Sequence, residues 1–239
     1  MFQEFILEVA KPHRRVFISL ILLTIFIFLI GFAVTLVFVE SRDLNFDLTL
    51  AEGIQAIKIP YFKNVMVFVS LFGQGLFPII TFSLVALWLF RSGFRKEVAF
   101  LPGVWAAPLI SEVSKIAISR PRPEEQLVAV YGSFPGFSFP SGHVLFYTVF
   151  FGFVAFLAFA LPRINPVARI VAVSICLFLV LSVGVSRVFL GAHWPTDVIA
   201  AYLIGLALLE ILTVSYVRFI YLPNMGAKEE NSNDHGRSR

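Results

Sequence analysis

Three polar clusters, KIAISRPRP at residues 115–123, PSGH at 140–143 and SRVFLGAHWPTD at 186–197, interrupt a chain that is otherwise mostly apolar. Each cluster lies at the edge of a hydrophobic run. The candidate residues in them supply three cations, two imidazoles and one carboxylate, a combination that predicts an anion site with a nucleophile if the chain brings the clusters together. The residues concerned are Lys115, Arg122, Ser141, His143, Arg187, His193 and Asp197.

The composition around these clusters predicts an integral membrane protein. Of 239 residues, 58% are hydrophobic and 14% are charged, and the mean hydropathy is +0.86, far outside the range of a soluble domain. The single cysteine, Cys176, excludes a disulfide framework and a Cys-rich metal site. The net charge of +4 comes from cations scattered between apolar runs, which argues against a nucleic-acid partner.

Six apolar runs predict six transmembrane helices, because a bilayer core about 30 Å thick needs about 20 helical residues. The expected fold class is therefore all-α, a polytopic membrane protein with the catalytic bundle in the last four helices. The third run should end at the RPRP sequence, because a residue before proline is pushed out of the helical region. The predicted spans are residues 16–39, 65–90, 98–119, 144–161, 170–186 and 198–217.

The chain is expected to divide into four parts. Residues 1–15 form an interfacial segment, 16–97 hold two spans that act as scaffold or substrate guide, 98–222 hold four spans with all three clusters, and 223–239 form a disordered polar tail. Most of the 19 Lys and Arg lie on the side of the termini. The positive-inside rule then predicts cytoplasmic termini and clusters on the extracytoplasmic side.

The first cluster has a purely structural interpretation beside the functional one. Lys115 lies about one turn before the end of its span, where an ammonium needs an anionic partner. Glu112, three residues earlier on the same helix, could be that partner instead of a substrate. Arg120 and Arg122 could be interfacial anchors.

The other two clusters stand at helix starts. Ser141 and Gly142 offer a hydroxyl and free N–H groups where a helix dipole favours phosphate, although Ser141 could be an ordinary N-cap with His143 packed in the first turn. Asp197 could simply favour the helix dipole, but it is also placed to orient His193, four residues earlier. Arg187 supplies a planar fork suited to phosphate oxygens.

The joint spacing, K-x6-R-P, P-S-G-H and S-R-x5-H-x3-D, resembles the type 2 phosphatidic acid phosphatase superfamily, and the six-span layout is similar to its membrane-bound branch of bacterial phosphatidylglycerophosphate and undecaprenyl-diphosphate phosphatases. The resemblance implies that His193 attacks phosphorus and forms a phosphohistidine, that Asp197 orients it, and that His143 is the general acid. It also implies a phosphate-binding set made of Lys115, Arg122, Ser141, Gly142 and Arg187.

This chemistry implies no cofactor and no metal, because three cations would neutralise the charge that Mg²⁺ often neutralises in phosphoryl transfer. A site at the membrane edge predicts a lipid substrate: phosphatidic acid, phosphatidylglycerophosphate or undecaprenyl diphosphate. Two other hypotheses stay open. One is a lipid phosphotransferase that uses the same residues, and the other is a transporter with an ion path through Gln74, Glu112 and Glu210. The oligomeric state is left open.

Overall fold

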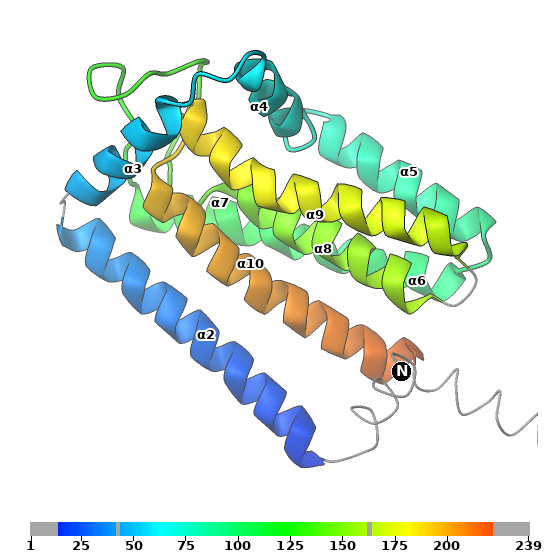
Figure 1. Cartoon of the computed structure of the whole chain (residues 1–239). Coiled ribbons are helices and arrows are strands. Elements are labelled where there is room, and N and C mark those ends of the chain that lie inside the picture. The colour runs from blue at the N-terminus through cyan, green and yellow to red at the C-terminus, as the bar shows by residue number, and fades with distance from the viewer. Residues whose placement is uncertain (1–13, 42–43, 162–163, 222–239) are drawn as a thin grey trace, which may run out of the picture.

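A computed structural model describes residues 14–41, 44–161 and 164–221. The predicted interfacial segment at the N-terminus and the predicted polar tail therefore lie outside the described residues, apart from the first helical residues of α2. Within the described ranges every regular element is a helix (Figure 1), which confirms the all-α class.

The helices follow one another as a series of long and short elements. Within the described ranges, three stretches are long and apolar enough to cross a membrane by length and composition: α8, α9 and the stretch from α10 to Phe219. The elements are α2 (Arg14–Ser41), α3 (Asn45–Gln55), α4 (Phe62–Leu71), α5 (Phe77–Arg91), α6 (Arg95–Phe100), the 3₁₀ helix η1 (Leu101–Trp105), α7 (Ala106–Ile118), α8 (Gly142–Ala160), α9 (Pro166–Phe189), α10 (Pro195–Tyr216) and the π-helical η2 (Val217–Tyr221).

The predicted first, fourth, fifth and sixth spans each correspond to one helix, α2, α8, α9 and α10. The second does not, because α4 ends at Leu71 and α5 begins at Phe77. Gly75, between them, has φ +56°, a conformation that glycine adopts at no steric cost. One continuous helix over 65–90 was therefore the wrong expectation. The third predicted span is likewise divided, into α6, η1 and α7.

The central element is α8, which is apolar around its whole circumference and buried on nearly all sides, as expected of a helix without a polar face. It packs against α9 and α10, while α2 lies along α10 and α4 lies on α9 (Figure 1). Close approach of α2 and α10 depends on Gly31, where a Cβ would lie 3.0 Å from the Leu203 side chain. Helices α2, α5 and α9 present large apolar side chains outward, where lipid would cover them.

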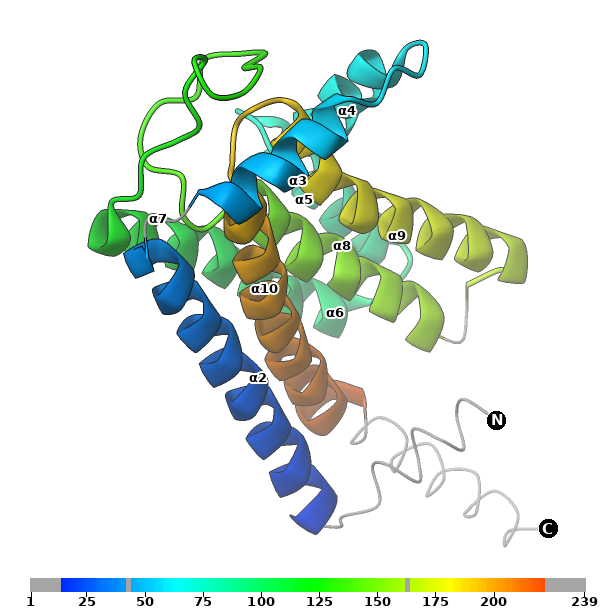
Figure 2. The ribbon, with the colours of Figure 1, turned by 60° about the vertical axis from the view of Figure 1, so that its left-hand side comes forward.

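One end of the bundle gathers the elements that carry the polar clusters. The short helix α3 crosses over the end of α9 and the start of α10, and the loop between α7 and α8 lies beside it (Figure 2). Gln55 of α3 fastens this arrangement: its Nε2 donates to the carbonyls of Ala129 and Phe189 at 2.7 and 3.0 Å, and its Oε1 accepts from the Ala129 N–H at 3.0 Å. The loop is thus tied to both α3 and α9.

Candidate active site

His193 lies in the short link between α9 and α10 and is 3% exposed. Its Nδ1 is 2.7 Å from the carbonyl oxygen of Ser138. A carbonyl only accepts, so Nδ1 carries the proton and Nε2 carries the lone pair. That Nε2 accepts from Nη1 of Arg122 at 3.3 Å, a group suited to phosphate oxygens. The unprotonated imidazole nitrogen and this guanidinium therefore stand side by side.

Asp197 is fully buried at the first turn of α10. Its Oδ2 accepts from the Trp194 N–H at 2.9 Å and lies 3.7 Å from Nδ1 of His193, while its Oδ1 accepts from Arg120 at 2.5 Å. The carboxylate thus caps α10 and binds Arg120. The expected contact between Asp197 and His193 is longer, at 3.7 Å, than the hydrogen bond of His193 to the Ser138 carbonyl, at 2.7 Å. The spacing of the motifs does not indicate this hydrogen bond to Ser138.

Arg187 enters the same space from the last turn of α9. Its Nη1 donates to the Ser70 hydroxyl at 2.5 Å, and its guanidinium lies over the ring of Phe134, with the guanidinium carbon 5.0 Å from the ring centroid. Its Nε is buried and has no hydrogen-bond partner within the described part of the chain. Nη1 of the guanidinium is therefore bound to Ser70, while the Nε–H remains able to donate to an acceptor.

Ser141 and His143 stand at the start of α8, and each has, within the described ranges, a buried polar atom without a hydrogen-bond partner, as Arg187 has. The Ser141 Oγ and the His143 Nε2 are buried and, like the Arg187 Nε, lack a partner among the residues described. The backbone N–H of Ser141 donates to the Asp197 carbonyl at 3.4 Å, which joins the second cluster to the third. A buried polar atom without a partner costs free energy, so a polar group bound beside these three atoms would gain by satisfying them.

Lys115 is close to the second cluster but already has a partner. Its Nζ lies 2.6 Å from Glu112, the i, i+3 pair that the structural interpretation predicts. Glu112 is largely exposed, so the pair is partly solvated and weak. A Cβ placed on Gly142 would lie 3.7 Å from the ammonium and 3.0 Å from the Ser111 hydroxyl. Glycine therefore leaves room between Lys115 and the start of α8.

The charges around His193 show that the three clusters meet. Burial first, and then the guanidiniums of Arg187 and Arg122, lower the pKa of His193 well below its usual range. The Lys115 ammonium acts in the same direction, and the hydrogen bond to Ser138 acts against it. The imidazole is therefore neutral at pH 7, which is the state that a nucleophilic histidine requires.

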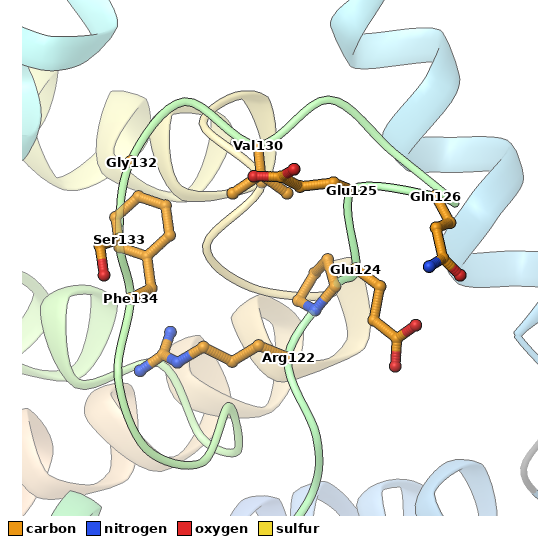
Figure 3. A pocket seen from close by; sticks show the side chains of 10 residues that line it. Arg122, Glu124, Glu125, Gln126, Val130, Gly132, Ser133 and Phe134 are labelled. Carbon is orange, nitrogen blue, oxygen red and sulfur yellow. The ribbon is translucent and has the colours of Figure 1, made fainter.

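An open cavity of about 540 Å³ lies on the outer side of Arg122, between the residues after the RPRP sequence and the glycine-containing part of the same loop (Figure 3). The Arg122 guanidinium points toward the side on which Phe134 lies. The cavity gives Arg122 access to solvent-borne or interfacial groups. Its lining is Arg122, Pro123, Glu124, Glu125, Gln126, Val130, Gly132, Ser133, Phe134 and Gly191.

Four residues around the site were not predicted as part of it: Asp47, Ser70, Arg120 and Ser138. Ser138 holds His193, Ser70 holds Arg187, and Arg120 binds Asp197 and Asp47. Arg120 appeared in the sequence only as a possible interfacial anchor. The others carry no spacing signal, because their partners lie far away along the chain.

No group of three or more His, Cys, Asp or Glu side chains that could hold a metal ion occurs in the described part of the chain. The fold and the site together define a class: a helical membrane protein with a neutral histidine among cations at one end of its bundle. Residues 96–221 match the model of the PAP2 superfamily, and the chain belongs to that family.

Known relatives agree with this assignment. The chain is 27% identical to an undecaprenyl-diphosphatase of Sulfolobus acidocaldarius over 77% of its own length and 82% of the relative's. It is 30% identical to phosphatidylglycerophosphatase B of Bacillus subtilis over 68% and 79% of the two chains. These phosphatase relatives confirm the prediction of a phosphoric ester hydrolase.

The fold is similar to a crystal structure of a transmembrane PAP2-type phosphatidylglycerolphosphate phosphatase from Bacillus subtilis. The TM-score is 0.69 at 24% sequence identity, covering 82% of this chain and 96% of that one. This match confirms a transmembrane PAP2 fold.

Proposed function

We propose that the protein is a lipid phosphatase that hydrolyses a phosphate monoester or diphosphate headgroup through a phosphohistidine on His193. The observation that carries this proposal is the set of buried, unpartnered atoms beside the neutral imidazole: Ser141 Oγ, His143 Nε2 and Arg187 Nε. A phosphoryl group would supply acceptors for the Ser141 hydroxyl and the Arg187 Nε–H, and its leaving oxygen would accept the proton of a protonated His143.

In the first step, the lone pair of His193 Nε2 attacks phosphorus and the bond from phosphorus to the lipid oxygen breaks. His143 gives its proton to that oxygen, so the lipid leaves as an alcohol, or as a monophosphate when the substrate is a diphosphate. Lys115, Arg122 and Arg187 stabilise the charge on the equatorial oxygens, together with the Ser141 hydroxyl and the Gly142 N–H.

In the second step, water attacks the phosphohistidine. His143, now neutral, takes a proton from the water as the P–N bond breaks. Inorganic phosphate leaves, and both histidines return to their starting states. During both steps the Ser138 carbonyl keeps the Nδ1 proton of His193 in place, while the nearby Asp197 carboxylate supplies negative charge as the imidazole becomes positive.

We further propose that the chain crosses the membrane six times, with cytoplasmic termini and an extracytoplasmic site. The distribution of Lys and Arg supports this orientation. The end of α9 and the start of α10, which carry the third cluster, lie at one end of the bundle, and α2 begins and α10 ends at the other (Figure 1). A lipid could then present its phosphate at the interface while its tails stay in the bilayer. Phosphatidylglycerophosphate and undecaprenyl diphosphate are the substrates that the names of the relatives support.

Two measurements on purified protein in detergent test the proposal. Phosphate release is followed with phosphatidylglycerophosphate, phosphatidic acid, undecaprenyl diphosphate and a soluble sugar phosphate; the lipids should be preferred. His193→Ala should lower turnover by at least about 10⁴-fold and remove the acid-labile phosphoenzyme, while Glu52→Gln, at an exposed acid of α3, serves as a folded control. A phosphoenzyme in His193→Ala would show that the nucleophile is elsewhere.

The same assay separates hydrolysis from phosphoryl transfer. Release of inorganic phosphate without any added acceptor indicates a hydrolase, whereas a phosphotransferase would stop at the phosphoenzyme. His143→Ala tests the acid: turnover should fall by about 10²- to 10⁴-fold for alkyl phosphates. The loss should be much smaller for aryl phosphates, whose leaving groups need no proton. Equal losses on both substrates would argue against the acid role.

A further inference from the structure

Asp47 lies on helix α3, outside the segment that matches the family model, residues 96–221. It is 1% exposed. An acid on the apolar side of a short helix should be exposed unless it has partners, and Asp47 has three hydrogen bonds. All of them go to Arg120, which binds Asp197, and to Thr196, which precedes Asp197 in the chain.

The partners of Asp47 are Arg120 and Thr196. Its Oδ2 accepts from Arg120 Nη2 at 2.7 Å and from the Thr196 hydroxyl at 2.8 Å, and its Oδ1 accepts from the Thr196 N–H at 2.8 Å. The Thr196 oxygen in turn accepts from Arg120 Nη1 at 2.7 Å. The guanidinium of Arg120 is therefore held by Asp47 on one side and by Thr196 and Asp197 on the other.

Arg120 reaches His193 by two routes. Through its side chain, Nη1 donates to Asp197, whose other oxygen lies 3.7 Å from His193 Nδ1. Through its backbone, the carbonyl of Arg120 accepts from the N–H and the hydroxyl of Ser138 at 2.9 and 3.2 Å. The carbonyl of Ser138 is the acceptor for His193 Nδ1. A shift of Arg120 would therefore move both groups that face the Nδ1 edge of the ring.

We propose that Asp47 is a positioning residue for the phosphoryl-transfer reaction, acting on His193 through Arg120. The inference rests on the proposed role of His193 as nucleophile. Helix α3 is suited to this task because its other end is also fixed, by the hydrogen bonds of Gln55 to Ala129 and Phe189. Asp47 does not touch the phosphate site itself.

Asp47→Asn is the main test, because the amide keeps the size of the side chain and removes its charge. The cations that bind phosphate are untouched, so KM should stay within about twofold, while kcat per active site falls by about 10- to 100-fold, the effect of a small misplacement of a reacting group. Active sites are counted from the burst of phosphoenzyme. Glu52→Gln, at an exposed acid of the same helix, should match the wild type.

The pH profile gives a second readout. With Asp47 neutral, the negative charge near Asp197 and His193 falls, so phosphoenzyme formation should lose rate with a changed pH dependence. A merely structural role would reduce the number of active sites and leave kcat per site and its pH profile unchanged, which would overturn the proposal. If Asp47→Asn does not fold, Thr196→Val decides: unchanged kcat per site would likewise overturn it, and a lowered kcat with unchanged KM would support it.

His193→Ala separates this proposal from the one on which it rests. If His193→Ala keeps its turnover, the assignment of the nucleophile fails, whatever Asp47→Asn does. If His193→Ala is inactive and Asp47→Asn has wild-type kcat and pH dependence, the nucleophile stands and the positioning role of Asp47 fails.

Discussion

Arg120 and Arg122 are two residues apart and each precedes a proline, yet their side chains have opposite environments. Arg120 is buried between two carboxylates, those of Asp47 and Asp197. Arg122 donates to backbone carbonyls and to the edge of His193, and it lines the open cavity. Only Arg122 is therefore placed to bind a phosphate, and the charge of Arg120 is already neutralised.

This difference predicts opposite outcomes for two matched substitutions. Arg120→Ala leaves two buried carboxylates without their counter-charge and should reduce the free energy of unfolding by about 3–5 kcal/mol. Arg122→Lys keeps the charge but loses the planar fork, so it should lower kcat/KM with little change in thermal unfolding. For each variant, kcat/KM and thermal unfolding are measured on the same detergent preparation. An active, stable Arg120→Ala variant would contradict the interpretation.

The lowered pKa of His193 predicts the direction of a pH effect. The neutral nucleophile persists as pH falls below about 6.5, the usual histidine value, and is lost only when pH falls through the lowered pKa. The second-order rate constant for phosphoenzyme formation at low substrate concentration, which reports the ionisation of the free enzyme, should therefore stay constant down to pH values clearly below 6.5. An acid limb at or above 6.5 would show that the imidazole is not desolvated.

The same shift affects stability. Between the lowered pKa and about 6.5 the unfolded chain binds the His193 proton and the folded chain does not. The contribution to stability is therefore complete above about pH 6.5 and declines as pH falls through this window.

At the scale of elements, the break between α4 and α5 brings backbone against the general-acid candidate. A Cβ on Gly73 would lie 2.5 Å from Cδ2 of His143 and 3.0 Å from the Tyr147 ring. Nearby, Ser186 donates to the Met66 carbonyl at 2.6 Å, and the Tyr147 hydroxyl donates to the Val69 carbonyl. The end of α4 and the turn that follows it therefore pack directly against the site.

Gly73→Ala should accordingly displace the His143 imidazole. Overpacking of this kind costs about 1–3 kcal/mol, and we expect turnover to fall by up to about 100-fold, with the loss concentrated on alkyl phosphates that need an acid. Gly53→Ala is the matched control, because a Cβ there meets nothing within 4 Å. Equal activity of both variants would show that the backbone at Gly73 can shift without displacing His143.

Long apolar runs made α8, α9 and α10 predictable, and the motifs made most of the candidate site predictable from residue types and order. The break at Gly73 was not predictable from hydropathy, because the residues of the turn are uncharged, as a span would be. Asp47 was not predictable either. Its partners lie more than 70 positions away, and no local pattern relates them.

At the scale of the whole molecule, the bundle separates two surroundings. Helices such as α9 expose apolar side chains along their length, including Val167, Ile170 and Leu181. The ion pairs of Arg120 join Asp47 of α3 to Asp197 of α10, and α3 lies at the start of α10, at one end of the bundle (Figure 2). Among the described residues, the buried ion pairs of Arg120 with Asp47 and Asp197 lie at this end, whereas a transporter would need such groups along a path between the ends. This arrangement favours catalysis at an interface.

The cations of that end predict independence from divalent metal. Phosphate release from a lipid substrate should be unchanged, within about twofold, after dialysis against EDTA, because Lys115, Arg122 and Arg187 supply the charge that a metal would otherwise supply. The measurement compares treated protein with and without added Mg²⁺. Activity that is lost with EDTA and restored by Mg²⁺ would contradict the cation argument.

The contacts that α3 makes through Asp47 and Gln55 have a consequence for chimeras made from two homologous chains. A fragment that begins at residue 96 would contain the histidines and the cations but would leave Arg120 without its Asp47 counter-charge and the loop without Gln55. Chimeras between homologues should therefore tolerate crossover points before Asn45 better than points between α3 and α6, since only the former inherit helix and catalytic segment as one matched piece.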